Sequence, residues 1–178
     1  VLVIRLQAGN RDKLNLDIHL TRSKDARTKA VDNNTLIFKG QIIDRKPPEG
    51  PEPNPGGSGP GGKHMRFGGV LKASTEGGSI ISRDSTLEIK EASKATILFS
   101  VATDYDLSTM NFDCAIDPVA KARATVNNAM QKPYRVLRRH HVAEHREMFE
   151  RVDLNLGQSQ QDNLPTNKRL EALKEGKA

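Results

Sequence analysis

The residues best suited to chemistry are two histidines and a glutamate in the C-terminal third of the chain. His141, Glu144 and His145 match the H-x-x-E-H pattern of inverted zinc proteases. Histidines four residues apart share one helix face, and the adjacent glutamate could act as a general base. A catalytic zinc would also need a third protein ligand, from His19, His64 or a distant carboxylate. The alternative is that both histidines are partly buried and hydrogen-bonded within the fold. We favour this alternative and assign no metal ligand.

A glycine-rich segment at residues 57–64, GSGPGGKH, is one residue short of the phosphate-binding pattern G-x-x-x-x-G-K-[ST]. In that motif the backbone N–H groups surround the phosphates and the final hydroxyl binds Mg²⁺. Here His64 takes the hydroxyl position, Pro60 removes one N–H donor, and no hydrophobic strand precedes the segment. We therefore expect no cofactor and assign no cofactor-binding residue.

Four aspartates, Asp104, Asp106, Asp113 and Asp117, lie where a strand-like pattern gives way to a helical one. Two of them could supply the pair of carboxylates that a glycosidase uses. Turn and cap roles also explain aspartates at such a junction. Cys114 has no histidine near it in the sequence, and the chain lacks the G-x-S-x-G pattern of serine hydrolases. We assign no catalytic residue.

The overall composition limits the partners that the chain can bind. The net charge is +6 and the isoelectric point is near 9.5, but the basic residues are scattered rather than gathered in one stripe. We therefore expect no nucleic acid partner. Aromatic residues make up 4% of the chain, which argues against a stacking platform for sugars. No apolar run is long enough to span a membrane.

The first two thirds of the chain alternate between apolar and polar residues. Leu14, Leu16, Ile18 and Leu20 are separated by polar side chains, which is the period of a half-buried strand. No helical crossovers separate these segments, so we predict an antiparallel β-sandwich followed by C-terminal helices. Other strands are expected at the opening of the chain and at residues 35–43, 65–74, 79–81, 85–90 and 95–103. Residues 47–63, rich in proline and glycine, predict a mobile loop.

The C-terminal third has helical periodicity. Asp117 before Pro118 is a good helix start, because aspartate caps free N–H groups and proline suits the first turn. A second helix is expected near Pro133, then a short extended piece at residues 152–157 and a last helix from Asn167. The expected inner face of the second helix is formed by Tyr134, Leu137, His141, His145, Met148, Phe149 and Val152.

Two C-terminal motifs resemble a known family. Residues 141–157 contain F-x-R-V-x-L-x-L-G, and residues 164–170 read LPTNKRL. Together they are similar to the region between the N-terminal β-domain and the helical barrel of family 95 glycoside hydrolases, the α-L-fucosidase-like enzymes. The upstream segments at residues 65–67, 77–78, 87–89 and 95–105 follow that family's order of strands. His145 stands where such proteins often have an aromatic residue, and the loop at residues 47–63 resembles a local insertion.

The resemblance implies an enzyme that hydrolyses terminal α-L-fucosides, or in some members α-galactosides, with inversion. Its active site lies in an (α/α)6 barrel after the linker, near or beyond Ala178, so none of its catalytic residues maps onto this chain. We expect residues 1–106 to be part of a supersandwich-like β-domain and residues 107–178 to be the helical linker. The oligosaccharide would be bound by the barrel, and the resemblance suggests a periplasmic or secreted protein.

We therefore predict a non-catalytic portion of a glycoside hydrolase. One alternative is a free-standing carbohydrate-binding β-sandwich module, and the other is a zinc-dependent hydrolase using His141, Glu144 and His145. The chain opens on VLVIRL, which is typical of the middle of a strand. A sandwich cut at this point would expose a sheet edge, and we expect self-association through it.

Overall fold

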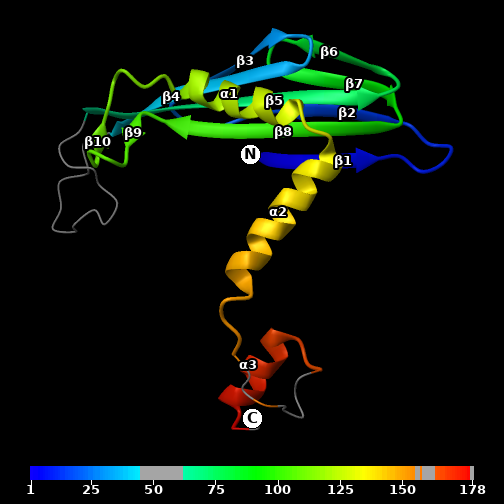
Figure 1. The fold of residues 1–178 in the computed structure, drawn as a ribbon, viewed down its shortest axis with the longest axis vertical. Coiled ribbons are helices and arrows are strands. Elements are labelled where there is room, and N and C mark those ends of the chain that lie inside the picture. The colour runs from blue at the N-terminus through cyan, green and yellow to red at the C-terminus, as the bar shows by residue number, and fades with distance from the viewer. Residues whose placement is uncertain (45–61, 155–156, 158–162, 177–178) are drawn as a thin grey trace. The chain divides into compact units, whose positions relative to one another are not determined.

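A computed structural model describes residues 1–44, 62–154, 157 and 163–176. The chain forms two compact units, Val1–Arg138 and Arg139–Ala178 (Figure 1). The prediction of a mainly β fold with antiparallel sheets and C-terminal helices is confirmed.

The first unit contains two antiparallel sheets. Sheet A has five strands in the order β1-β8-β5-β4-β3, and sheet B has three strands in the order β2-β7-β6. The strands of sheet A are β1 (Leu2–Gln7), β3 (Ala26–Asp32), β4 (Thr35–Asp44), β5 (Gly62–Glu76) and β8 (Lys94–Thr103). Those of sheet B are β2 (Leu14–His19), β6 (Ser79–Arg83) and β7 (Thr86–Ala92). A short ribbon pairs β9 (Tyr105–Asp106) with β10 (Asn111–Phe112).

The two sheets pack face to face over an apolar core. Alternation along β8 places Ala95 and Ile97 in this core and turns Leu98 to the opposite face of sheet A. Sheet A is therefore buried on both faces in its central strands. The buried residues between the sheets are Leu36, Leu71, Ala73, Leu87, Ile89, Ala92, Ala95 and Ile97.

Helix α1 (Pro118–Met130) covers the second face of sheet A (Figure 1). The Asp117 carboxylate accepts hydrogen bonds from the backbone N–H groups of Val119 and Ala120, at 2.9 and 3.2 Å, so the predicted helix start is confirmed. The apolar stripe of the helix packs against three strand residues of the sheet. The buried residues of this second core are Ala122, Val126 and Ala129 of α1 with Ile37, Val70 and Leu98.

Four strands differ from the sequence prediction. Strands β3, β9 and β10 were not expected. Strand β5 begins at Gly62, so the expected loop at residues 47–63 is wrong at its last two positions. The reason is that Gly62 and Lys63 continue the ladder to β4, opposite Asp44 and Ile43. Residues 47–61 of that loop lie outside the described residues.

Helix α2 (Tyr134–Phe149) starts in the first unit and continues into the second. Leu137 packs at the α1 core, and the guanidinium of Arg5 lies 5.9 Å from the ring centre of Tyr134. The expected inner face is wrong farther along the helix. His141 and His145 are exposed, and Met148 and Phe149 are 57% and 71% exposed.

The second unit also contains helix α3 (Thr166–Lys174), close to the predicted last helix. The extended piece expected at residues 152–157 forms no strand at its described positions. Among the described residues, no helix is long and apolar enough to cross a membrane.

Candidate functional site

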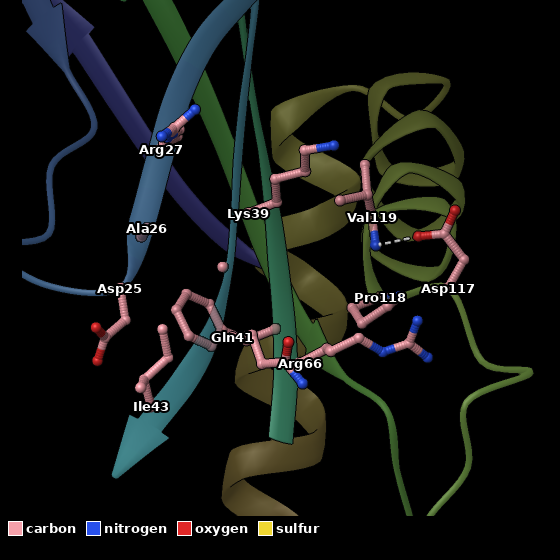
Figure 2. Close-up of a pocket in the computed structure, with 12 residues that line it drawn as sticks. Asp25, Ala26, Arg27, Lys39, Gln41, Ile43, Arg66, Asp117, Pro118 and Val119 are labelled. Atoms are coloured by element: carbon pink, nitrogen blue, oxygen red, sulfur yellow. Dashed lines mark hydrogen bonds between the residues drawn. The ribbon is translucent and has the colours of Figure 1, made fainter. Parts of the chain in front are cut away.

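A cleft of about 730 Å³ opens between the first turn of α1 and the ends of β3 and β4 (Figure 2). This volume falls within the range of small-molecule sites, roughly 300–1,000 Å³. Charged and polar groups line it together with apolar ones. The lining residues are Asp25, Ala26, Arg27, Lys39, Gly40, Gln41, Ile43, Arg66, Phe67, Asp117, Pro118 and Val119.

Two glycines set the walls of this cleft. A Cβ on Gly68 would lie 2.6 Å from Cγ2 of Val119 and 2.9 Å from its amide nitrogen, so only glycine lets the start of α1 rest on β5. A Cβ on Gly40 would overlap the carbonyl oxygen of Asp25. Asp25 has a φ of 59°, in the left-handed region that aspartate tolerates better than most residues. Close backbone packing therefore fixes both walls.

Arg66 occupies the cleft wall but is already engaged in structural contacts. Its Nε donates to Asp104 Oδ2 at 2.8 Å, and its Nη2 donates to the carbonyl oxygens of Cys114 and Ile116 at 2.7 and 3.1 Å. The hydrogen bond to Asp104 raises the pKa of Arg66 above its ordinary value. Asp117 is likewise engaged as the cap of α1. These two residues hold the cleft in shape.

Arg27 and Lys39 are the cations of the cleft that remain available. They are directly opposed in the ladder between β3 and β4, which places both side chains on the same face of sheet A. Neither forms an ion pair with another described residue. In Figure 2 the Lys39 side chain extends from β4 toward the side of the cleft on which Val119 lies. The arrangement can accept an anion.

The aspartates considered as glycosidase carboxylates have structural partners. Asp104 is 2% exposed and accepts from the backbone N–H and the guanidinium of Arg66. Asp106 accepts from the backbone and hydroxyl of Ser108, which lowers its pKa. Asp113 accepts from the backbone N–H of Ala115 at 2.8 Å. With Asp117 as the helix cap, the cluster makes the turn and cap contacts that the sequence predicts.

The histidine pair considered for zinc lies on α2. The rings of His141 and His145 are 6.1 Å apart between centres and nearly parallel, and His145 also stacks on Phe149. Both are exposed, so the expectation of partly buried, hydrogen-bonded histidines is wrong. Within the described part of the chain, no group of three His, Cys, Asp or Glu side chains could hold a metal ion. His19 lies in the first unit, 3.1 Å from the Thr86 hydroxyl.

The phosphate-binding hypothesis falls mostly on undescribed residues. Residues 57–61 lie outside the described part of the chain, and the side chains of Lys63 and His64 are not described either. Cys114 is exposed, and its carbonyl oxygen contributes to the Arg66 contacts described above.

Comparison with known protein families identifies the family to which the two sheets of the first unit belong. The family model described as "Glycosyl hydrolase family 65, N-terminal domain" matches residues 1–108, more than half of the chain. The chain belongs to this family. A second model, described as "Glycosyl hydrolase family 95 catalytic domain", matches residues 133–178. The resemblance to family 95 seen in the sequence is therefore supported in the helical region. No curated protein matches the chain.

The two matches lie one after the other along the chain. The family 65 N-terminal domain accounts for both sheets, and the family 95 match begins just before α2. Helix α1 lies between the two matches and packs on sheet A. Both matches are to glycoside hydrolase domains. The prediction that the chain is a portion of a glycoside hydrolase is therefore confirmed.

Sequence reasoning missed the cations of the cleft. The signal was available in residues 26–32, ARTKAVD, where Ala26, Thr28 and Ala30 alternate with charged or exposed side chains. Reading that segment as a strand would have placed Arg27 on the outward face. Its pairing with Lys39 depends on the register of β3 and β4, which the sequence does not show.

Proposed function

We propose that this family 65 N-terminal domain is the non-catalytic β-domain of an enzyme that hydrolyses terminal α-L-fucosides. The domain and the helical linker at residues 107–178 support a catalytic (α/α)6 barrel that begins near or beyond Ala178, and the family 95 match at residues 133–178 supports this assignment. The acid and the water-activating residues of the reaction lie in that barrel, downstream of the helices described here. The order of the two family matches carries this proposal.

Two carboxylates of the acidic cluster, Asp104 and Asp117, support a non-catalytic role. A general acid and a general base need side chains that can reach a sugar and exchange protons. Asp104 is buried against Arg66, and Asp117 is committed to two backbone N–H groups of α1. Removing either from these contacts would disturb the loop or the helix that it holds.

Activity measurements on two proteins test the proposal. One is the chain of 178 residues, and the other is the same chain continued by its genomic downstream sequence. With p-nitrophenyl α-L-fucoside we expect turnover by the longer protein and none by the shorter. A second substrate, p-nitrophenyl α-galactoside, distinguishes the fucosidase from the galactosidase specificity that the resemblance to family 95 implies. Turnover of the fucoside by the shorter chain would refute a non-catalytic role, and a longer protein specific for galactosides would refute the fucosidase assignment.

A further inference from the structure

The paired cations of the cleft, Arg27 and Lys39, form no ion pair with another described residue. Like charges directly opposed across two strands destabilise a sheet, because their side chains are held close together. Arg27 and Lys39 occupy such positions at the cleft, and no described carboxylate forms an ion pair with either. An anion bound between them would relieve this repulsion. Guanidinium and ammonium groups together offer several donors to carboxylate or sulfate oxygens.

The other walls of the cleft suit a sugar ring. Asp25 lines the cleft, and its carboxylate makes no hydrogen bond to another described residue. A carboxylate accepts hydrogen bonds from sugar hydroxyls. Ile43 and Val119 add apolar surface against which the C–H groups of a ring can pack. Because close packing at Gly40 and Gly68 fixes the backbone of the walls, ligand binding needs to order side chains rather than backbone.

We propose that the cleft between α1 and the β3–β4 pair binds an anionic saccharide unit, one that carries a carboxylate or a sulfate ester. Arg27 and Lys39 bind the anionic group, and Asp25 accepts hydrogen bonds from the ring hydroxyls. The choice of a saccharide rests on the proposed function, whereas the anion rests on the geometry of the cleft. In the enzyme, such a site would bind an acidic region of the substrate in addition to the catalytic site.

Titration calorimetry with the chain of 178 residues tests this site. The probes are glucuronate, glucose 6-sulfate, inorganic sulfate and glucose. The variant R27Q/K39Q removes both cations. Its matched control, K13Q/K29Q, also removes two positive charges. Lys13 lies between β1 and β2 and Lys29 lies on β3, and neither lines the cleft. D25N separates the recognition of hydroxyls from that of the anion.

We expect glucuronate, glucose 6-sulfate or both to bind, and glucose to bind much more weakly. R27Q/K39Q should weaken binding by at least about tenfold, the loss expected when charged hydrogen bonds are removed, and K13Q/K29Q should leave it unchanged. D25N should weaken the binding of the acidic sugars without weakening the binding of inorganic sulfate. The relative affinity of the two acidic sugars identifies the anionic group.

Three results would overturn the proposal. They are binding of neither acidic sugar, equal effects of the two double variants, and binding of inorganic sulfate without either sugar. Each of them leaves the fucosidase proposal intact, because that proposal depends on turnover by the longer protein. Conversely, a longer protein without fucosidase activity would leave the measured affinity of the cleft unchanged.

Discussion

Arg66 on β5 and Asp104 after β8 form an ion pair whose carboxylate is almost completely buried. The Nε–Oδ2 distance is 2.8 Å, and the side chain of Asp104 is 2% exposed. The backbone N–H of Arg66 donates to the other carboxylate oxygen, and the backbone N–H of Asp104 donates to the carbonyl of Arg66. Because Arg66 also contacts two carbonyls just before α1, this pair fastens the α1 approach loop, residues 104–117, to sheet A.

We predict that D104N destabilises the first unit. The amide presents one acceptor where the carboxylate presents two, so one donor of Arg66 loses its charged partner inside the fold. Loss of such a hydrogen bond costs about 2 kcal/mol in free energy of unfolding. Urea denaturation followed by circular dichroism measures the change. The matched control D106N, on the half-buried strand β9 where the carboxylate accepts from the neutral donors of Ser108, should have a smaller effect. Equal stability of D104N and the parent chain would contradict the prediction.

The packing of α1 on β5 depends on Gly68. A methyl group there would press on both the side chain and the backbone of Val119, and the backbone of a first helical turn cannot move aside cheaply. We therefore expect G68A to lower the free energy of unfolding by about 1–3 kcal/mol. The control is G9A, whose Cβ would meet only the flexible carboxylate of Asp12. If G68A melts like the parent chain while G9A does not, the helix does not rest on β5 as described.

Acid should weaken the fold partly through Glu76. Hydrogen bonds from Lys94 and Arg5 lower the pKa of Glu76 below its ordinary value. A lowered folded-state pKa means that the carboxylate stabilises the fold above the unfolded pKa, and that this stabilisation is lost as the pH falls through the folded pKa. The free energy of unfolding should therefore decline between about pH 5 and pH 3, and less steeply in E76Q. E150Q, at the residue that follows α2, serves as the control, and parallel curves of unfolding free energy against pH for the parent chain and E76Q would exclude this role of Glu76.

Local patterns predicted those parts of the fold that local chemistry determines. The alternation in β2 was recognisable because one of its faces packs on a sheet and the other meets water. Asp117 and Pro118 determine the start of α1 without help from the rest of the chain. Strand β3 was not predicted because its inward residues, Ala26, Thr28 and Ala30, are small or polar. Its strand conformation comes from pairing with β4.

Long-range relationships determine the rest, and the sequence does not encode them visibly. Helical periodicity identified a stripe on α2 that includes His145 and Phe149, but periodicity cannot tell whether another element covers it. The cleft needs the register of Arg27 against Lys39 and the close approach of α1 at Gly68. Both follow from the assembled sandwich. A candidate site formed in this way has no sequence motif.

Strand β1 is the more exposed apolar edge of sheet A. On its free side no described strand pairs with it, and Leu2 and Ile4 are 56% and 41% exposed. The opposite edge, β3, carries Arg27 and Lys29, and charges of this kind discourage edge pairing. We therefore predict that the chain self-associates by pairing β1 with β1 of a second copy, which would bury these side chains and satisfy free backbone groups.

Light scattering over a series of protein concentrations measures this association. The variant I4K places a charge on the β1 edge and should give a monomer, because pairing would bring two lysines together. V31K places the same charge on β3, where the parent residue is 40% exposed, and should leave the association unchanged. A parent chain that stays monomeric at every concentration would contradict self-association. Dissociation by V31K but not by I4K would place the interface at β3 instead. Because β3 also carries Arg27 of the cleft, association would then compete with ligand binding there.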